Sequence, residues 1–223
     1  MAHGQANRLF PRYSIQLPLL HKTKAPACIR AGVGWTRNLS EGGACVELAE
    51  RLQPRVLLHV LLRTDRGAIE LEAEVAWASE AAAEGGGILH GLTFARIAPD
   101  QLQALQTLIV SKGQVQLAGV RLPLEIAVAC QPKGKSGQAL RGLTGDISRA
   151  GLLLLLPEVL PPGSALDIIL HTPKGPLAAE GVVAWVEPPA GRAVGPPYRH
   201  GLRFTYLGWS TSLSLGLCLT EAA

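Results

Sequence analysis

The chain has 223 residues, of which 48% are hydrophobic and 17% charged, and its 21 basic and 17 acidic side chains leave a net charge of +4. This much apolar surface excludes an intrinsically disordered chain, and the length suits one large domain or two small ones. The basic residues form no dense stripe, which argues against a dedicated nucleic-acid-binding protein.

Membrane and secretory features are missing from the sequence. The densest apolar run, 152–156, ends at Pro157 and is far shorter than the roughly 20 residues that span a bilayer. The first residues contain no apolar signal segment, and the four cysteines form no CxxC pair. We therefore expect a cytoplasmic protein without membrane insertion, whose cysteines are small buried side chains.

The first half of the chain has the alternation of a small antiparallel β-protein. Its clearest strand is 68–77, in which apolar residues alternate with Glu70, Glu72 and Glu74. Further strands are expected at 13–21, 27–37, 43–48, 55–63 and 88–96. The strand 55–63 is apolar on both faces apart from His59, so we expect it to be deeply buried. A helix is predicted over 99–109, where Leu102, Leu105 and Leu108 recur at helical spacing.

The second half repeats the first. The segment Asn38-Leu-Ser-Glu-Gly-Gly43 matches Asp146-Ile-Ser-Arg-Ala-Gly151 at an offset of 108 residues, and Trp77 matches Trp185 at the same offset. Strands are expected in this half at 121–130, 138–147, 151–156, 165–171, 177–186 and 199–206. The C-terminal segment 209–223 contains three serines and has less helical character.

We therefore predict an all-β fold of two tandem six-stranded antiparallel β-barrels, the first followed by a short α-helix. The predicted domains are 1–112 and 120–223, joined by a linker at 113–119. Trp77 and Trp185 are expected in the barrel cores. His90 and His200 occupy equivalent strand positions and are expected to be hydrogen-bonded structural histidines.

Two polar patterns in the first copy are candidates for a binding site. Arg8-Leu-Phe-Pro-Arg12 carries two guanidinium groups, which match phosphate oxygens and the O6/N7 edge of guanine; the alternative is a basic N-terminal tail. Asn38-Leu-Ser40-Glu-Gly-Gly43 precedes an apolar strand; the alternative is an ordinary hairpin turn. The recurrence of the second pattern in the second copy favours a functional role.

The order of these patterns, followed by Trp77, Gly91-Leu-Thr-Phe94 and a helix, resembles the PilZ domain, a family of bacterial receptors for cyclic di-GMP. The resemblance covers nearly all of residues 8–111. The second copy, about 120–207, resembles the family through Asp146-x-Ser148-x-x-Gly151 and Gly201-Leu-x-Phe204. The resemblance implies a six-stranded barrel that binds its ligand on the outer face.

The resemblance also implies roles for the first copy's residues. Arg8 and Arg12 would wrap guanine and phosphate, and Asn38 would meet a guanine edge. Ser40 would donate a hydrogen bond near the ligand, and Gly43 would let the backbone approach closely. No cofactor is implied, because cyclic di-GMP is a ligand.

The second copy keeps the polar motif, Asp146, Ser148 and Gly151, but not the arginine pair. Arg121 falls opposite Arg12, whereas Leu117 falls opposite Arg8. We interpret it as a degenerate PilZ unit with a structural or partner-binding role.

The leading hypothesis is a receptor that binds cyclic di-GMP at the first domain and relays the signal to an unknown protein partner. The alternative is an adaptor or structural interaction protein that keeps the scaffold without binding nucleotide. Catalytic residues are not expected, since Ser40 and Ser148 have no visible His/Asp partners. The six histidines lack metal-ligand spacing, so no metal site is expected.

Overall fold

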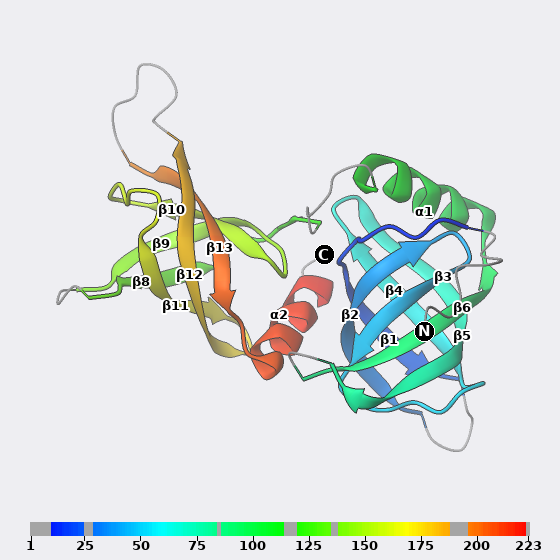
Figure 1. Cartoon of the computed structure of the whole chain (residues 1–223). Coiled ribbons are helices and arrows are strands. Elements are labelled where there is room, and N and C mark those ends of the chain that lie inside the picture. Colours follow the sequence, from blue (N-terminus) through cyan, green and yellow to red (C-terminus); the bar gives the residue numbers. More distant parts are fainter. Residues whose placement is uncertain are drawn as a thin grey trace, which may run out of the picture. The chain divides into compact units, whose positions relative to one another are not determined.

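The computed structural model describes residues 10–24, 29–83, 86–113, 120–134, 138–187 and 196–221. The chain divides into two compact units, Met1–Val120 and Arg121–Ala223. Each unit contains a curved sheet and one helix (Figure 1). Arg8 and most of the predicted linker lie outside the described residues.

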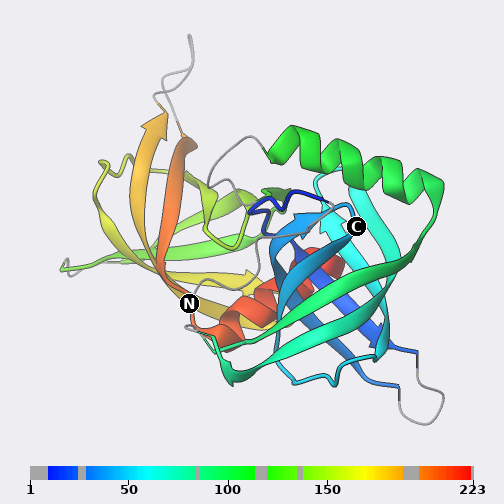
Figure 2. The ribbon, with the colours of Figure 1, turned by 45° about the vertical axis from the view of Figure 1, so that its right-hand side comes forward.

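The first unit is a closed antiparallel barrel in the order β1-β2-β3-β6-β5-β4. Its strands are β1 (Pro18–Thr23), β2 (Ala31–Ser40), β3 (Gly43–Leu48), β4 (Leu57–Thr64), β5 (Gly67–Ala82) and β6 (Ile88–Ile97). The helix α1 (Pro99–Lys112) follows β6 and lies beside the β4–β5 turn at one end of this barrel (Figure 2). Lys112 in this helix pairs with Asp65 in the turn at 2.8 Å.

The second unit repeats this topology. Its strands are β7 (Leu122–Pro123), β8 (Ala127–Pro132), β9 (Leu140–Ile147), β10 (Gly151–Leu156), β11 (Ala165–Thr172), β12 (Gly175–Glu187) and β13 (Tyr198–Tyr206). The order is β10-β13-β12-β11-β8-β9, closed by pairing of β9 with β10, while the short β7 pairs with β9. Strands β8 to β13 thus take the places of β1 to β6, which confirms the prediction of two six-stranded antiparallel barrels.

A second helix corrects the sequence-based view of the C-terminus. The helix α2 spans Trp209–Glu221, where we expected weak helical character. Its buried side chains include Leu215, Cys218 and Leu219, which share one helix face at spacings of three and four residues. Serine lowers helix propensity by only a few tenths of a kcal/mol, roughly, so burial of this face outweighs the three serines.

The strands of the barrel wall alternate between core and solvent. In β5 the inward side chains of Ile69 and Leu71 are 2% and 3% exposed, and the glutamates point outward, as predicted. Strand β4 alternates as well, with Leu57 43% exposed. The expectation that β4 is buried on both faces is therefore wrong, because its outer face belongs to the surface of a single-layer barrel.

The prediction that Trp77 and Trp185 lie in the barrel cores is also wrong. Trp77 and Trp185 are 45% and 43% exposed, whereas Trp35 fills the first core at 1% exposure. The β5–β6 pairing shifts register between Val75 and Trp77, so β5 has one extra residue there. A β-bulge of this kind reverses the side on which the next residue points, and β12 has the same irregularity before Trp185.

Candidate functional site

The segment before β1 positions the first candidate side chain. Tyr13 and Leu39 exchange two backbone hydrogen bonds, each 2.9 Å from N to O. This bridge fixes the segment alongside the end of β2. Arg12, the residue before Tyr13, therefore lies next to the polar motif that begins at Asn38.

Arg12 and Asn38 are in direct contact. The Nη1 atom of Arg12 donates a hydrogen bond to Oδ1 of Asn38 at 3.1 Å, on the exposed side of the barrel. Because the amide is neutral, it orients the guanidinium without cancelling its charge. The structure thus places a positive, five-donor group on the outer face, and brings together two residues that are 26 positions apart.

Ser40 and Gly43 shape the turn between β2 and β3. Ser40 is 3% exposed, and its hydroxyl donates to the carbonyl oxygen of Gly43 at 3.0 Å. A side chain at Gly43 would collide with the carbonyl oxygen of Leu92 in β6. Ser40 and Gly43 thus hold the polar motif against β6. The close approach that Gly43 allows in this structure is between its own backbone and the backbone of Leu92.

One register row extends from Asn38 across the outer face. Asn38 pairs with Cys45, Cys45 with Gly91, and Gly91 with Trp77. A Cβ atom on Gly91 would run into the indole ring of Trp77, so the ring lies flat over the glycine. Burial raises the pKa of the Cys45 thiol, and the positive charge of Arg12 opposes that rise. The row therefore runs from a cation at one end to a half-exposed indole at the other.

This arrangement suits an anionic ligand with an aromatic base. A guanidinium binds phosphate oxygens or the guanine edge through paired donors, and an exposed indole offers a stacking surface to any base. Sequence reasoning missed Trp77, because the bulge that exposes it leaves no mark in the alternation. The available signal is a glycine that occurs in both copies and pairs with the tryptophan, Gly91 with Trp77 and Gly201 with Trp185.

The second unit contains a matching set with a different charge. Nη1 of Arg121 lies 2.7 Å from Oδ1 of Asp146. Ser148 donates to the carbonyl oxygen of Gly151 at 3.1 Å, as Ser40 does to Gly43, and Trp185 lies over its glycine. Arg121 therefore takes the place of Arg12, but the carboxylate of Asp146 neutralises its charge, whereas Asn38 does not neutralise Arg12.

The duplicated histidines are structural, as predicted. Nε2 of His90 accepts from the backbone N–H of Leu52 at 3.0 Å, and His200 accepts from Leu160 at the same distance. Burial lowers the pKa of both rings, which keeps Nε2 free to accept. Among the described residues, no group of three or more His, Cys, Asp or Glu side chains is placed to hold a metal ion. Neither described helix has the length and apolar character that crossing a bilayer requires.

Comparison with known proteins identifies the family to which both halves of the chain are similar. A family model described as the PilZ domain matches residues 6–111 and 118–208. Among solved structures, the Bacillus subtilis inhibitor of motility MotI/DgrA is 13% identical, with 93% of this chain and 95% of that chain covered and a TM-score of 0.39.

Two further structures contain a nucleotide. PlzA of Borreliella burgdorferi in complex with c-di-GMP is 13% identical over 92% of this chain and 86% of that chain, with a TM-score of 0.40. The PilZ domain of Escherichia coli YcgR with c-di-GMP is 22% identical over 47% and 89%, with a TM-score of 0.39. None of the curated proteins matches the chain.

Proposed function

The chain belongs to the PilZ domain family, and on that premise we propose that it is a receptor that binds cyclic di-GMP at its first barrel and relays the signal to a protein partner. The observation that carries the proposal is the Arg12–Asn38 contact at 3.1 Å, in the same register row as the exposed Trp77.

The chemistry of the ligand matches this face. Cyclic di-GMP has two phosphates and two guanines, so it needs cations, hydrogen-bonding groups and a stacking surface. Arg12, joined by Arg8 from the N-terminal segment, provides the guanidinium forks. Asn38 presents an amide to a guanine edge. Trp77 provides the aromatic face, while Ser40 and Gly43 keep the turn in place.

Charge favours the first barrel over the second. Asn38 leaves the positive charge of Arg12 uncompensated, whereas Asp146 lies 2.7 Å from Arg121 and cancels its charge locally. A dianionic ligand would have to break that ion pair or approach its carboxylate, and both are unfavourable. The second barrel therefore has the backbone scaffold of the binding site but lacks its uncompensated positive charge.

The proposed role is regulatory rather than catalytic. The described residues around Arg12 and Asn38 include no activated nucleophile, because Ser40 is buried and donates to Gly43, and the Cys45 thiol has a raised pKa. Such a site binds its ligand and releases it unchanged.

Titration of the purified full-length protein with cyclic di-GMP by calorimetry tests the proposal. We expect binding by the wild type, loss of roughly ten- to a hundredfold in affinity for Arg8→Ala, and a smaller loss for Asn38→Ala because the amide is neutral. Asp146→Ala, the matched control in the second barrel, leaves the affinity unchanged. Absence of binding by a folded wild type would favour the alternative of a scaffold adaptor.

A further inference from the structure

The outer faces of the two barrels differ in chemistry although their strands are equivalent. In the first barrel, Leu61 pairs with Glu70, and the next row holds Lys22, His59, Glu72 and Arg96. In the second barrel, Ile169 pairs with Ala178, and the next row holds Gln131, Asp167, Glu180 and Tyr206. Glu70 and Arg96 of the first barrel are thus replaced by Ala178 and Tyr206.

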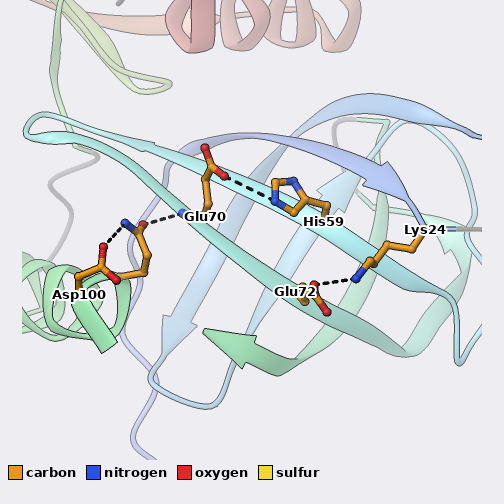
Figure 3. A network of polar contacts seen from close by, with 6 residues as sticks. Lys24, His59, Glu70, Glu72 and Asp100 are labelled. Carbon is orange, nitrogen blue, oxygen red and sulfur yellow. Dashed lines mark hydrogen bonds and ion pairs between the residues drawn. The ribbon is translucent and has the colours of Figure 1, made fainter. Parts of the chain in front are cut away.

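The first barrel covers this face with charged and polar side chains. Lys24 lies 2.6 Å from Glu72, and Nε2 of His59 lies 3.6 Å from Glu70 (Figure 3). Glu70 pairs with Leu61, which pairs in turn with Leu20, so a carboxylate lies at the end of a row that is otherwise apolar. A hydrophilic face of this kind is typical of barrel wall in contact with solvent.

The second barrel has a depression of about 350 Å³ in the same place. Its apolar lining includes Ala129, Ile169, Ala178 and Tyr206. Ile169 is 43% and Tyr206 63% exposed. Replacement of a glutamate by alanine and of an arginine by tyrosine therefore leaves a hollow with an exposed aliphatic and an exposed aromatic side chain.

The depression has a net negative charge on one side. Asp167 and Glu180 both pair with Lys133, at 3.4 Å in the case of Asp167, so these three groups leave one negative charge. Arg141 is not part of the lining, but it pairs with Ala129 across β8 and β9, so a basic residue lies at the β9 end of this row. The electrostatic asymmetry orients a bound cation toward β11 and β12.

We propose that this depression binds an extended segment of a partner protein that presents an apolar side chain next to a lysine or arginine. The apolar side chain fills the hollow between Ile169 and Tyr206, and the cation meets Asp167 and Glu180. The hollow covers only a small part of the roughly 800 Å² that each protein buries in a stable complex, so it suits a peptide segment better than a second copy of the chain.

This inference deepens the proposed function, since a receptor needs a surface that its partner contacts. It is independent of nucleotide, because every residue that carries it belongs to the second barrel. Peptide binding measured without cyclic di-GMP therefore succeeds or fails separately from the nucleotide titration.

Selection of a random peptide library displayed on phage, with the full-length protein as bait, provides the test. We expect enriched peptides to share an apolar residue beside a lysine or arginine. A synthetic peptide of the enriched sequence should bind the wild type, and Ala178→Glu and Tyr206→Arg should each weaken binding at least about tenfold, because a hydrated charge then occupies the hollow.

These two substitutions introduce the residues that the first barrel carries at the same positions, so the fold accommodates them, and thermal unfolding verifies it. Glu70→Ala in the first barrel is the matched control and leaves binding unchanged. Enrichment of acidic peptides, or binding that survives both substitutions, would overturn the proposal. A concentration-dependent dimer that Ala178→Glu dissociates would overturn it as well, in favour of a second copy as the occupant.

Discussion

His21 makes the stability of the first barrel depend on pH. Its ring is 7% exposed, and within the described structure its Nδ1 atom is buried without a hydrogen-bond partner. Burial, together with the charge of His90, lowers the pKa of His21 from 6.5 to about 4, against the opposing effect of Glu50. The ring is therefore neutral in the folded barrel, whereas it ionises near pH 6.5 in the unfolded chain.

The sign and size of the effect follow from this difference. Since the unfolded chain binds the proton more tightly, the stability contributed by neutral His21 is complete above the unfolded pKa and is lost as pH falls through the window from 6.5 toward 4. At about 1.4 kcal/mol per pKa unit, the loss is on the order of 3 kcal/mol at the acid end and about 2 kcal/mol near pH 5.

The second barrel supplies a matched variant. His21 pairs with Gly32 across β1 and β2, whereas the equivalent pair in β8 and β9 is Cys130 with Leu140. A Cβ atom on Gly32 would lie 2.6 Å from the His21 ring, so the large and small partners are exchanged between the copies. The double variant His21→Cys/Gly32→Leu removes the titrating ring and refills the space that it occupied.

Amide hydrogen exchange measures the two barrels separately. We expect the opening free energy of β1 and β2 in the wild type to fall by about 2 kcal/mol between pH 7 and pH 5 relative to the double variant, while β8 and β9 change equally in both proteins. Identical pH dependence of β1 and β2 in the wild type and the double variant would show that His21 does not make the first barrel pH-sensitive.

Three further predictions concern the first barrel. Gly43→Ala costs about 1–3 kcal/mol of stability, because the new methyl group meets the Leu92 carbonyl, and chemical denaturation measures it. Trp77→Ala weakens cyclic di-GMP binding about tenfold through loss of base stacking, whereas Trp185→Ala does not; calorimetry on the pair decides. His90→Ala leaves the backbone N–H of Leu52 without its acceptor and costs roughly 1–3 kcal/mol from that group alone, visible as a lower unfolding midpoint.

The fold was predictable from the sequence because the alternation and the repeat are local signals. The period-two pattern of β5 follows directly from a wall with one face in the core and one in solvent. The duplication of each landmark then doubled the evidence for every strand. The helix α2 was missed because its serines weaken the pattern, and burial of Leu215 and Leu219 depends on tertiary packing that composition does not show.

The candidate site was predictable only in part. The resemblance to the family singled out Arg12 and Asn38, and the structure brings them into contact. The exposure of Trp77 depends on one extra residue in β5, and such a bulge is set by the pairing of two strands. The replacement of Glu70 by Ala178 could be read from the repeat, but the hollow that results requires the neighbouring strands to be in place.

In the proposed function, cyclic di-GMP binds the first barrel and not the second. The equivalent arginines provide the most direct test, because Arg12 donates to neutral Asn38 while Arg121 pairs with Asp146. Calorimetric titration of the full-length protein should show a loss of roughly ten- to a hundredfold in affinity for Arg12→Ala and no change for Arg121→Ala. Abolished binding in Arg121→Ala, with Arg12→Ala binding as tightly as the wild type, would contradict the account.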